Sequence, residues 1–182
     1  MEERAATPKR DATLGTSQDR PAPVGTTIKT KLERGDRYSA PEVYSLEITL
    51  LETIRGEEAW RRVSAEGITH EPPRSGFEYL LVRARFGYFS KGRGFGHEKE
   101  PYTIEPDYFV SVAADGGTPL KVPALQRQPE PPLIGVPFSP GDTKEGWIVL
   151  QVEEAETNPL IIFKREYREN TYGMWGPVWF QL

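Results

Sequence analysis

The chain has 182 residues, of which 23 are basic and 27 are acidic, and its formal net charge is −4. This balance gives no electrostatic reason to expect nucleic acid or an anionic membrane as a partner, and no apolar run approaches the roughly 18 residues of a membrane span. Because cysteine is absent, structural disulfides, thiolate metal sites and cysteine nucleophiles are excluded.

The first residues are predicted to be a disordered tail or linker over residues 1–19, followed by one domain over residues 20–182. After Met1, the only sizeable aliphatic side chains before residue 25 are Leu14 and Val24. The segment carries no basic-then-apolar leader. Two interpretations stay open: a cytoplasmic protein with a disordered start, or an exported protein from which a leader or lipid anchor has been removed.

The first clear elements are a strand, a helix and a second strand. Residues 44–54 alternate apolar and polar side chains, as in a half-buried strand. Residues 55–66 contain competent helix formers and an apolar stripe, and Gly67 is a suitable stop. Residues 77–89 have one apolar face and one face with arginines, which predicts a central strand of an antiparallel sheet.

The second half of the chain is predicted to contain only strands and loops. A glycine-rich loop over residues 90–100 leads to a strand over residues 108–114, and Asp115-Gly116-Gly117 then makes a hairpin turn into a return strand that begins at Leu120. The proline-dense residues 126–137 are expected to stay outside any sheet. Further strands are predicted over residues 145–152, 160–164 and 178–182. About seven strands separated by turns indicate an all-β fold, a β-sandwich with one short helix.

Four stretches of the chain carry a family resemblance through their order and spacing. They read RPAPVGTTI over residues 20–28, EITLLETIRGEEAW over 47–60, PPRSGFEYLLVRARF over 72–86 and FSPGDTKEGWIVLQV over 138–152. Together they resemble the telokin-like, immunoglobulin-like domains of unknown function found in bacterial and archaeal secreted proteins and lipoproteins. The resemblance covers residues 20–182 and implies an immunoglobulin-like antiparallel β-sandwich. It also implies an extracellular or cell-surface location, which the missing leader leaves open, and it offers no catalytic residues.

The glycine-rich stretch over residues 92–97 is one candidate binding loop. Arg93 and His97 could grip an anion, and Phe95 could make an aromatic contact. A phosphate-binding loop, however, needs a strand before it and a helix after it, and this stretch joins strands. It is therefore interpreted as a solvated loop in which Phe95 is a candidate surface contact.

Candidate catalytic and metal-binding residues are few. His70 and His97 are the only histidines, whereas a catalytic zinc site commonly uses three protein ligands. Two clusters of acidic side chains could work in acid/base pairs: Glu57 and Glu58, and Glu153, Glu154 and Glu156. A solvated face explains each cluster more simply.

Nucleophilic catalysis and calcium binding find equally little support. Ser75 and Ser139 both lie in turns, and the chain has no Gly-x-Ser-x-Gly elbow. The short turn at Asp115 provides too few oxygen ligands for calcium. No catalytic residue, metal or cofactor is therefore predicted.

Aromatic side chains near the end of the chain are the other candidates for contacts. Exposed aromatics stack on sugars or anchor protein partners. The simpler interpretation is that Trp147, Trp175 and Trp179 cover the sheets and the core. Residues 168–176 are long and turn-rich, however, so Tyr172 and Trp175 are kept as possible surface contacts.

The leading functional hypothesis is a non-enzymatic, extracytoplasmic binding or interaction module for a protein or a cell-envelope component. It would act through loop aromatics or through strand addition at a sheet edge. The alternatives are a carbohydrate-binding module with a coplanar row of exposed aromatics, a small hydrolase with two carboxylates facing one cleft, and a structural spacer between an anchor and another domain. Neither nucleic acid nor a membrane span is expected.

Overall fold

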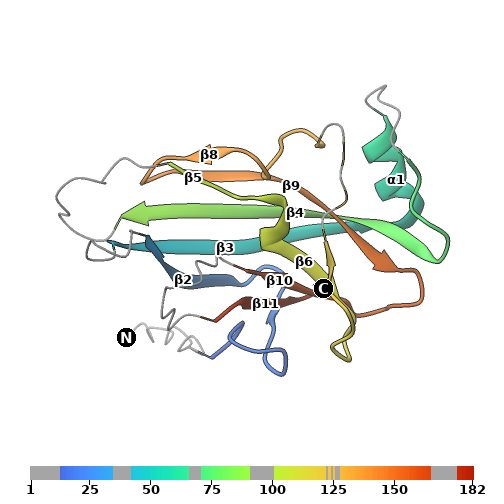
Figure 1. Cartoon of the computed structure of the whole chain (residues 1–182), viewed down its shortest axis with the longest axis horizontal. Coiled ribbons are helices and arrows are strands. Elements are labelled where there is room, and N and C mark those ends of the chain that lie inside the picture. The colour runs from blue at the N-terminus through green and yellow to red at the C-terminus, as the bar shows by residue number, and fades with distance from the viewer. Residues whose placement is uncertain are drawn as a thin grey trace, which may run out of the picture.

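The computed structural model describes residues 13–34, 42–65, 71–90, 101–121, 128–164 and 176–182, together with Pro123 and Leu125. In these ranges the chain forms two packed β-sheets, one α-helix and the short 3₁₀-helix η1 (Pro106–Tyr108) (Figure 1). A two-stranded ribbon lies along one side of the sandwich. The predicted all-β fold, a β-sandwich with one short helix, is confirmed.

The first sheet has four antiparallel strands in the order β2-β3-β4-β9. Its strands are β2 (Thr27–Arg34), β3 (Glu42–Arg55), β4 (Phe77–Ser90) and β9 (Thr143–Glu153). β4 is a central strand between β3 and β9, as its alternating pattern predicted. A register shift between Leu50 and Glu52 marks a β-bulge in β3, which locally increases the twist of that strand.

The second sheet has the order β1-β11-β10-β6-β7. Its strands are β1 (Ala22–Pro23), β6 (Phe109–Val112), β7 (Leu120–Lys121), β10 (Leu160–Phe163) and β11 (Val178–Gln181). β1 and β11 run parallel, and the other pairs are antiparallel. The ribbon pairs β5 (Tyr102–Thr103) with β8 (Pro137–Phe138). The predicted hairpin between β6 and β7 turns at Gly116, whose φ of 87° favours glycine.

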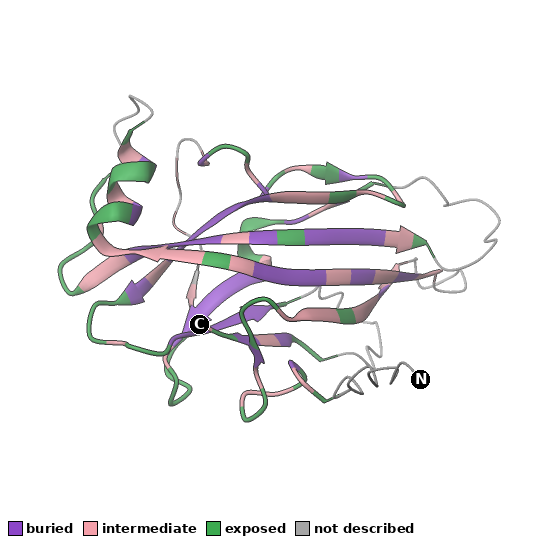
Figure 2. Ribbon diagram, turned by 180° about the vertical axis from the view of Figure 1, so that it is seen from behind, coloured by how far each residue is buried: buried purple, intermediate pink, exposed green. Residues whose placement is uncertain are grey.

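The inner faces of the two sheets share one apolar core. Successive side chains of a strand point to opposite faces, so alternate residues of β4 and β9 turn inward. Leu80 and Ala84 of β4 and Ile148 and Leu150 of β9 are fully buried in this way. Figure 2 shows the buried positions in purple along the long strands of the first sheet. The spacing of apolar residues in the sequence therefore placed the core correctly.

Phe86 of β4 joins both sheets and the ribbon. Its ring centroid lies 5.8 Å from that of Tyr102 in β5, 5.1 Å from that of Phe138 in β8 and 5.7 Å from that of Phe163 in β10. The contacts with the two phenylalanines are edge-to-face, a geometry that the charge distribution of aromatic rings favours. Phe86 has no exposed surface, so its whole side chain contributes to packing.

The helix α1 (Gly56–Ser64) covers one end of the outer face of the first sheet. Its buried residues Ala59 and Val63 pack with Leu81 and Val149 in a second, smaller apolar cluster. Acidic residues in the first turn and basic residues in the last turn match the helix dipole. The helix predicted over residues 55–66 is confirmed. Among the described helices none is long and apolar enough to cross a membrane.

Residues 13–20 form turns that brace the edges of both sheets. The backbone N–H of Trp179 in β11 donates to the carbonyl of Gly15 at 2.9 Å. The side-chain amide of Gln18 donates to the carbonyl of Ala114, next to the β6–β7 hairpin, at 3.1 Å. A Cβ on Gly15 would lie 3.1 Å from Ile28 of β2, and the φ of Gly15 is 75°. Glycine therefore permits the close approach between this segment and β2.

Residues 131–133 form a strap along the edge of β9. The N–H of Trp147 donates to the carbonyl of Pro131 at 2.8 Å, and the N–H of Leu133 donates to the carbonyl of Trp147 at 3.2 Å. A short parallel bridge results between the strap and the strand. Because the strap occupies hydrogen-bonding groups of β9, the middle of this sheet edge is closed to strand addition.

The strap corrects one expectation from the sequence. The proline-dense residues 126–137 were expected to stay outside any sheet, but Pro132 bridges to β9 and Pro137 belongs to β8. Proline has no N–H to donate to a neighbouring strand. It is tolerated at a sheet edge because no strand there needs that hydrogen bond. Gly146 makes the approach possible, since a Cβ there would lie only 2.7 Å from the carbonyl carbon and oxygen of Pro132.

Candidate binding surface

The three surface contacts predicted from the sequence lie outside the described residues. Phe95 falls within residues 91–100, and Tyr172 and Trp175 fall within residues 165–175. These three residues therefore remain predictions. Both histidines, His70 and His97, also lie outside the described ranges.

The other aromatic side chains considered above are packed rather than displayed. Trp147 is 8% exposed, and Trp179 is half-buried against the apolar cluster on β6 and β10. Tyr102 is buried in the main core, and Tyr108 packs against that core. In the part of the chain that the structure describes, no aromatic side chain is fully exposed. The coplanar row of exposed aromatics that the carbohydrate-binding hypothesis predicts is not found among the described residues.

Four tyrosines stack in a row at one end of the core. Tyr44 lies on Tyr88 with 4.8 Å between ring centroids, Tyr88 lies on Tyr102 at 5.5 Å, and Tyr102 lies on Tyr108 at 6.2 Å. Arg34 of β2 donates to the hydroxyl oxygen of Tyr88 at 3.3 Å and to the carbonyl of Pro101 at 3.1 Å. The row and Arg34 therefore hold the chain that enters β5 against the first sheet. This role is structural.

The phenol of Tyr44, at one end of this row, is strongly affected by its surroundings. Its hydroxyl donates to Oε2 of Glu42 at 2.7 Å, and its side chain is almost fully buried in the main core. Burial raises the pKa of Tyr44 well above its ordinary value, and the hydrogen bond to Glu42 adds to this effect. The phenol is therefore held in its neutral form.

We expect Tyr44 to stay protonated beyond the pH near 10 at which an exposed tyrosine ionises. The pKa of Tyr44 is higher in the folded state than in the unfolded state. The contribution of this phenol to the stability of the fold is therefore present below the unfolded pKa and is lost as the pH rises through the folded pKa. An ultraviolet titration of phenolate absorbance for the wild type, minus that for Tyr44→Phe, isolates this group. A difference curve with its midpoint at the ordinary tyrosine value would contradict the assignment.

The acidic clusters found in the sequence take different roles in the structure. Glu57 is exposed on α1, and Glu58 forms an i,i+4 ion pair with Arg62 at 3.2 Å. The carboxylate of Glu156 accepts the N–H of Ala114 at 3.1 Å and that of Asn158 at 2.8 Å. Glu156 thus holds two turns together. The described residues contain no group of three or more histidine, cysteine or acidic side chains suited to a metal ion.

A cavity of about 250 Å³ opens between the two sheets at the end where β4 begins and β9 ends. Its lining residues come from three separate segments of the chain: Arg74 and Phe77; Ser111, Val112, Ala113, Gly117, Thr118 and Leu120; and Val152, Glu153, Glu156 and Pro159. Two of the predicted acidic residues, Glu153 and Glu156, are thereby brought to one cavity. Since both oxygens of Glu156 accept backbone hydrogen bonds, that carboxylate is better suited to structure than to proton transfer.

The outer face of the first sheet carries a network of ion pairs across its strands. Arg83 of β4 lies between Glu52 of β3, at 3.7 Å, and Glu145 of β9, at 2.8 Å. Arg85 pairs with the same Glu145 at 2.6 Å, and a further pair joins β2 to β3. These side chains are directly opposite or diagonal neighbours in the strand register. We call them the charged ladder: Lys29, Glu47, Glu52, Arg83, Arg85 and Glu145.

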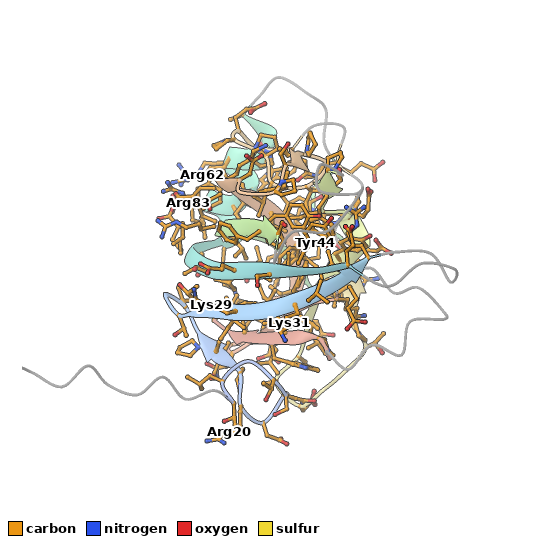
Figure 3. All side chains as sticks on the ribbon, turned by 90° about the vertical axis from the view of Figure 1, so that its left-hand side faces the viewer. Arg20, Lys29, Lys31, Tyr44, Arg62 and Arg83 are labelled. Carbon is orange, nitrogen blue, oxygen red and sulfur yellow. The ribbon has the colours of Figure 1, made fainter. Side chains whose placement is uncertain are left out.

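The charged ladder faces outward on a largely uncovered sheet. Figure 3 shows Lys29, Arg62 and Arg83 projecting from the same side of the molecule. In Figure 2, which turns this face toward the viewer, α1 lies at one end of it, and no other described helix or strand lies across it. Beside the ladder, the ring of Phe89 lies over Gly87, where a Cβ would be 2.6 Å from the ring edge.

Glu145 is held in its ionised form by its two arginines. The hydrogen bond from Arg85 is the largest cause that lowers the pKa of Glu145, and the charge of Arg83 adds a smaller effect. The lowered pKa means that its contribution to stability is present above the unfolded pKa and is lost as the pH falls through the folded pKa.

We expect Arg85→Ala to raise the pKa of Glu145 more than Arg83→Ala does. The reason is that Arg85 makes the stronger hydrogen bond to the Glu145 carboxylate. Carboxyl-carbon NMR titration of the wild type and both variants measures the midpoint directly. Equal shifts, or a larger shift in Arg83→Ala, would show that the two arginines do not divide the interaction in this way.

Sequence reasoning missed both the ladder and the cavity as sites. It noticed Arg83 and Arg85 on the polar face of one strand, but Glu145 lies about 60 residues later and joins them only through the sheet register. Period-two charge alternation on adjacent strands was the available signal. For the cavity there was none, because its walls come from three distant segments.

Comparison with known proteins gives little help with identity. No protein-family model matches the chain, and no curated protein matches it. Among solved structures, MPT63, a secreted protein from Mycobacterium tuberculosis, is similar with a TM-score of 0.45 and 13% sequence identity. The alignment covers 84% of this chain and 92% of that chain.

Proposed function

We propose that the protein is a non-enzymatic, extracytoplasmic binding module that contacts a protein or a cell-envelope component through the charged ladder. The observation that carries this proposal is the outer face of the first sheet, which is open and bears fixed charges of both signs. Charges held in a defined pattern on a rigid sheet favour selective contacts more than they add to affinity. The telokin-like resemblance agrees with this assignment.

The composition of the described surface supports a polar contact. Among large hydrophobic side chains in the described ranges, only Val24 is exposed, at 37%. An apolar docking patch is therefore not found in that part of the surface, and binding through the ladder should weaken as salt rises. The middle of the β9 edge is closed by the strap, which favours the sheet face over that stretch of edge for partner binding.

The experiment combines cell fractionation with binding to isolated envelopes of the source organism. The double variant Arg83→Gln, Arg85→Gln removes two ladder charges, and Arg61→Gln, Lys164→Gln removes the same net charge at exposed positions outside the ladder. We expect the ladder variant alone to bind more weakly, by up to about thirtyfold, since each of the two removed charges contributes up to about 1 kcal/mol. Recovery of the protein in the cytoplasm, or equal binding by both variants, would refute the proposal.

The hydrolase alternative has one observation in its favour, the presence of Glu153 and Glu156 on one cavity. Its test is an assay with chromogenic glycosides and esters. Turnover lost in Glu153→Gln and retained in the neighbouring Glu154→Gln would support hydrolysis. Turnover absent from the wild type would leave the binding module as the better assignment.

A further inference from the structure

The cavity between the sheets combines apolar walls with an acidic opening. Its apolar lining includes Phe77, Leu120 and Val152, of which Val152 is almost fully buried. Pro159 adds a further buried apolar surface. The hydroxyl of Ser111, also on the wall, donates to the carbonyl of Gln151 and is thereby satisfied. The interior therefore favours an apolar group.

The charges around the opening favour a cation. Glu153 is exposed and Glu156 is half-exposed, so two carboxylates line the rim, against one guanidinium, that of Arg74. The guanidinium carbon of Arg74 lies 3.6 Å from the ring centroid of Phe77, so a cation–π contact already engages it. The carboxylate of Asp115, which accepts the N–H of the lining residue Gly117, adds further negative charge.

Arg55, a further cation near the rim, is already matched. Arg55 pairs with Glu78 at 2.6 Å and donates to the backbone carbonyl of Glu156 at 2.7 Å. The carboxylate of Glu156 is fixed by two backbone N–H groups, so it cannot swing away from the rim without breaking both bonds. The negative charge at the opening is therefore preorganised, which reduces the cost of ordering a ligand there.

We propose that this cavity binds a ligand in which a small apolar group carries an ammonium or guanidinium group. The apolar group would fill the space between Phe77, Leu120 and Val152, and the cation would lie at Glu153 and Glu156. A volume of about 250 Å³ is below the roughly 300–1,000 Å³ of ordinary ligand pockets, which limits the ligand to one side chain or a small amine. The site is separate from the charged ladder, so it does not depend on the proposed function.

The test uses phenethylamine as the probe, with 2-phenylethanol and 3-phenylpropanoate as neutral and anionic probes of similar size. Backbone ¹H–¹⁵N spectra of the full chain report on Val112, Gly117 and Thr118 during each titration. We expect saturable shifts at these residues with the amine, weaker shifts with the alcohol and none with the acid. Equal binding of all three probes, or shifts elsewhere only, would overturn the proposal.

Two variants locate the binding within the cavity. Glu153→Gln should weaken phenethylamine binding by up to about fivefold, the value of one exposed charge pair, whereas the exposed neighbour Glu154→Gln should change it less. Thr118→Trp places a large side chain at an exposed lining position, and it should abolish binding while unfolding at an unchanged urea midpoint. Unchanged affinity in both Glu153→Gln and Thr118→Trp would overturn the proposal.

The two sources of such a ligand are a basic peptide and a free organic amine. An acetylated and amidated Phe-Lys dipeptide keeps the apolar and cationic groups but removes the free termini. Binding of the dipeptide at least as tight as that of phenethylamine would assign the site to protein partners. Binding of phenethylamine alone would assign it to small amines, and binding of neither probe would refute the proposal without bearing on the ladder.

Discussion

Replacement of Phe86 by alanine is expected to lower the free energy of unfolding by about 3–5 kcal/mol, the range found for large aromatic side chains deleted from cores. The size of the effect follows from its position. The ring is fully buried and touches Tyr102, Phe138 and Phe163, so its loss opens a cavity where both sheets and the ribbon meet. Urea denaturation followed by tryptophan fluorescence measures the loss.

The matched control for this variant is Phe89→Ala on the same strand. Phe89 points to the outer face and is only half-buried, so its removal should cost about 1 kcal/mol. Phe86→Leu keeps most of the buried volume and should fall between the two. If Phe86→Ala and Phe89→Ala lowered the free energy of unfolding equally, Phe86 would not be the residue at which the two sheets and the ribbon meet.

Replacement of Gly146 by alanine is expected to cost about 1–3 kcal/mol, the usual effect of overpacking. The added Cβ would lie 2.7 Å from the carbonyl carbon and oxygen of Pro132 and 2.8 Å from the carbonyl oxygen of Pro131. These are backbone atoms, so the clash is relieved only if the strap moves away from β9. The hydrogen bonds between the strap and Trp147 should then weaken or break.

Hydrogen exchange distinguishes this local effect from a general loss of stability. In Gly146→Ala the amide hydrogens of Trp147 and Leu133 should exchange faster. The exchange rates of the amide hydrogens at the centre of β4 should change only as much as the global free energy of unfolding changes. The control is Gly87→Ala, where the added Cβ meets the ring of Phe89, a side chain that can rotate away. A larger loss of stability in Gly87→Ala than in Gly146→Ala would contradict this account.

The elements with strong alternation were predictable from the sequence. β3, β4 and β9 each bury one face in the core, so their apolar residues repeat every second position. The helix α1 was recognised because its helix formers follow directly after a strand and precede Gly67. The β6–β7 hairpin was recognised from its turn, where only glycine adopts the required φ without strain.

Other elements were missed for identifiable physical reasons. β2 follows the same alternation, but it is an edge strand whose outer face carries Lys29 and Lys31. Lysines on an edge strand prevent aggregation, and they also make the apolar pattern of the strand harder to recognise. β5 and β8 have two residues each, too few for any pattern. The charged ladder and the cavity depend on register and on contacts between distant segments, which local patterns do not encode. The candidates taken from loops, Phe95, Tyr172 and Trp175, lie outside the described residues.

The parallel pairing of β1 with β11 determines how the domain would respond to mechanical load. Ala22 lies opposite Phe180 and Pro23 opposite Gln181, so one strand near each end of the described chain runs beside the other in the same direction. A pull on the two ends would then act along the strands in shear. The bonds between β1 and β11 would resist together with the bond that joins Trp179 of β11 to Gly15, in the turns before β1. Unzipping one bond at a time would require force across the strands.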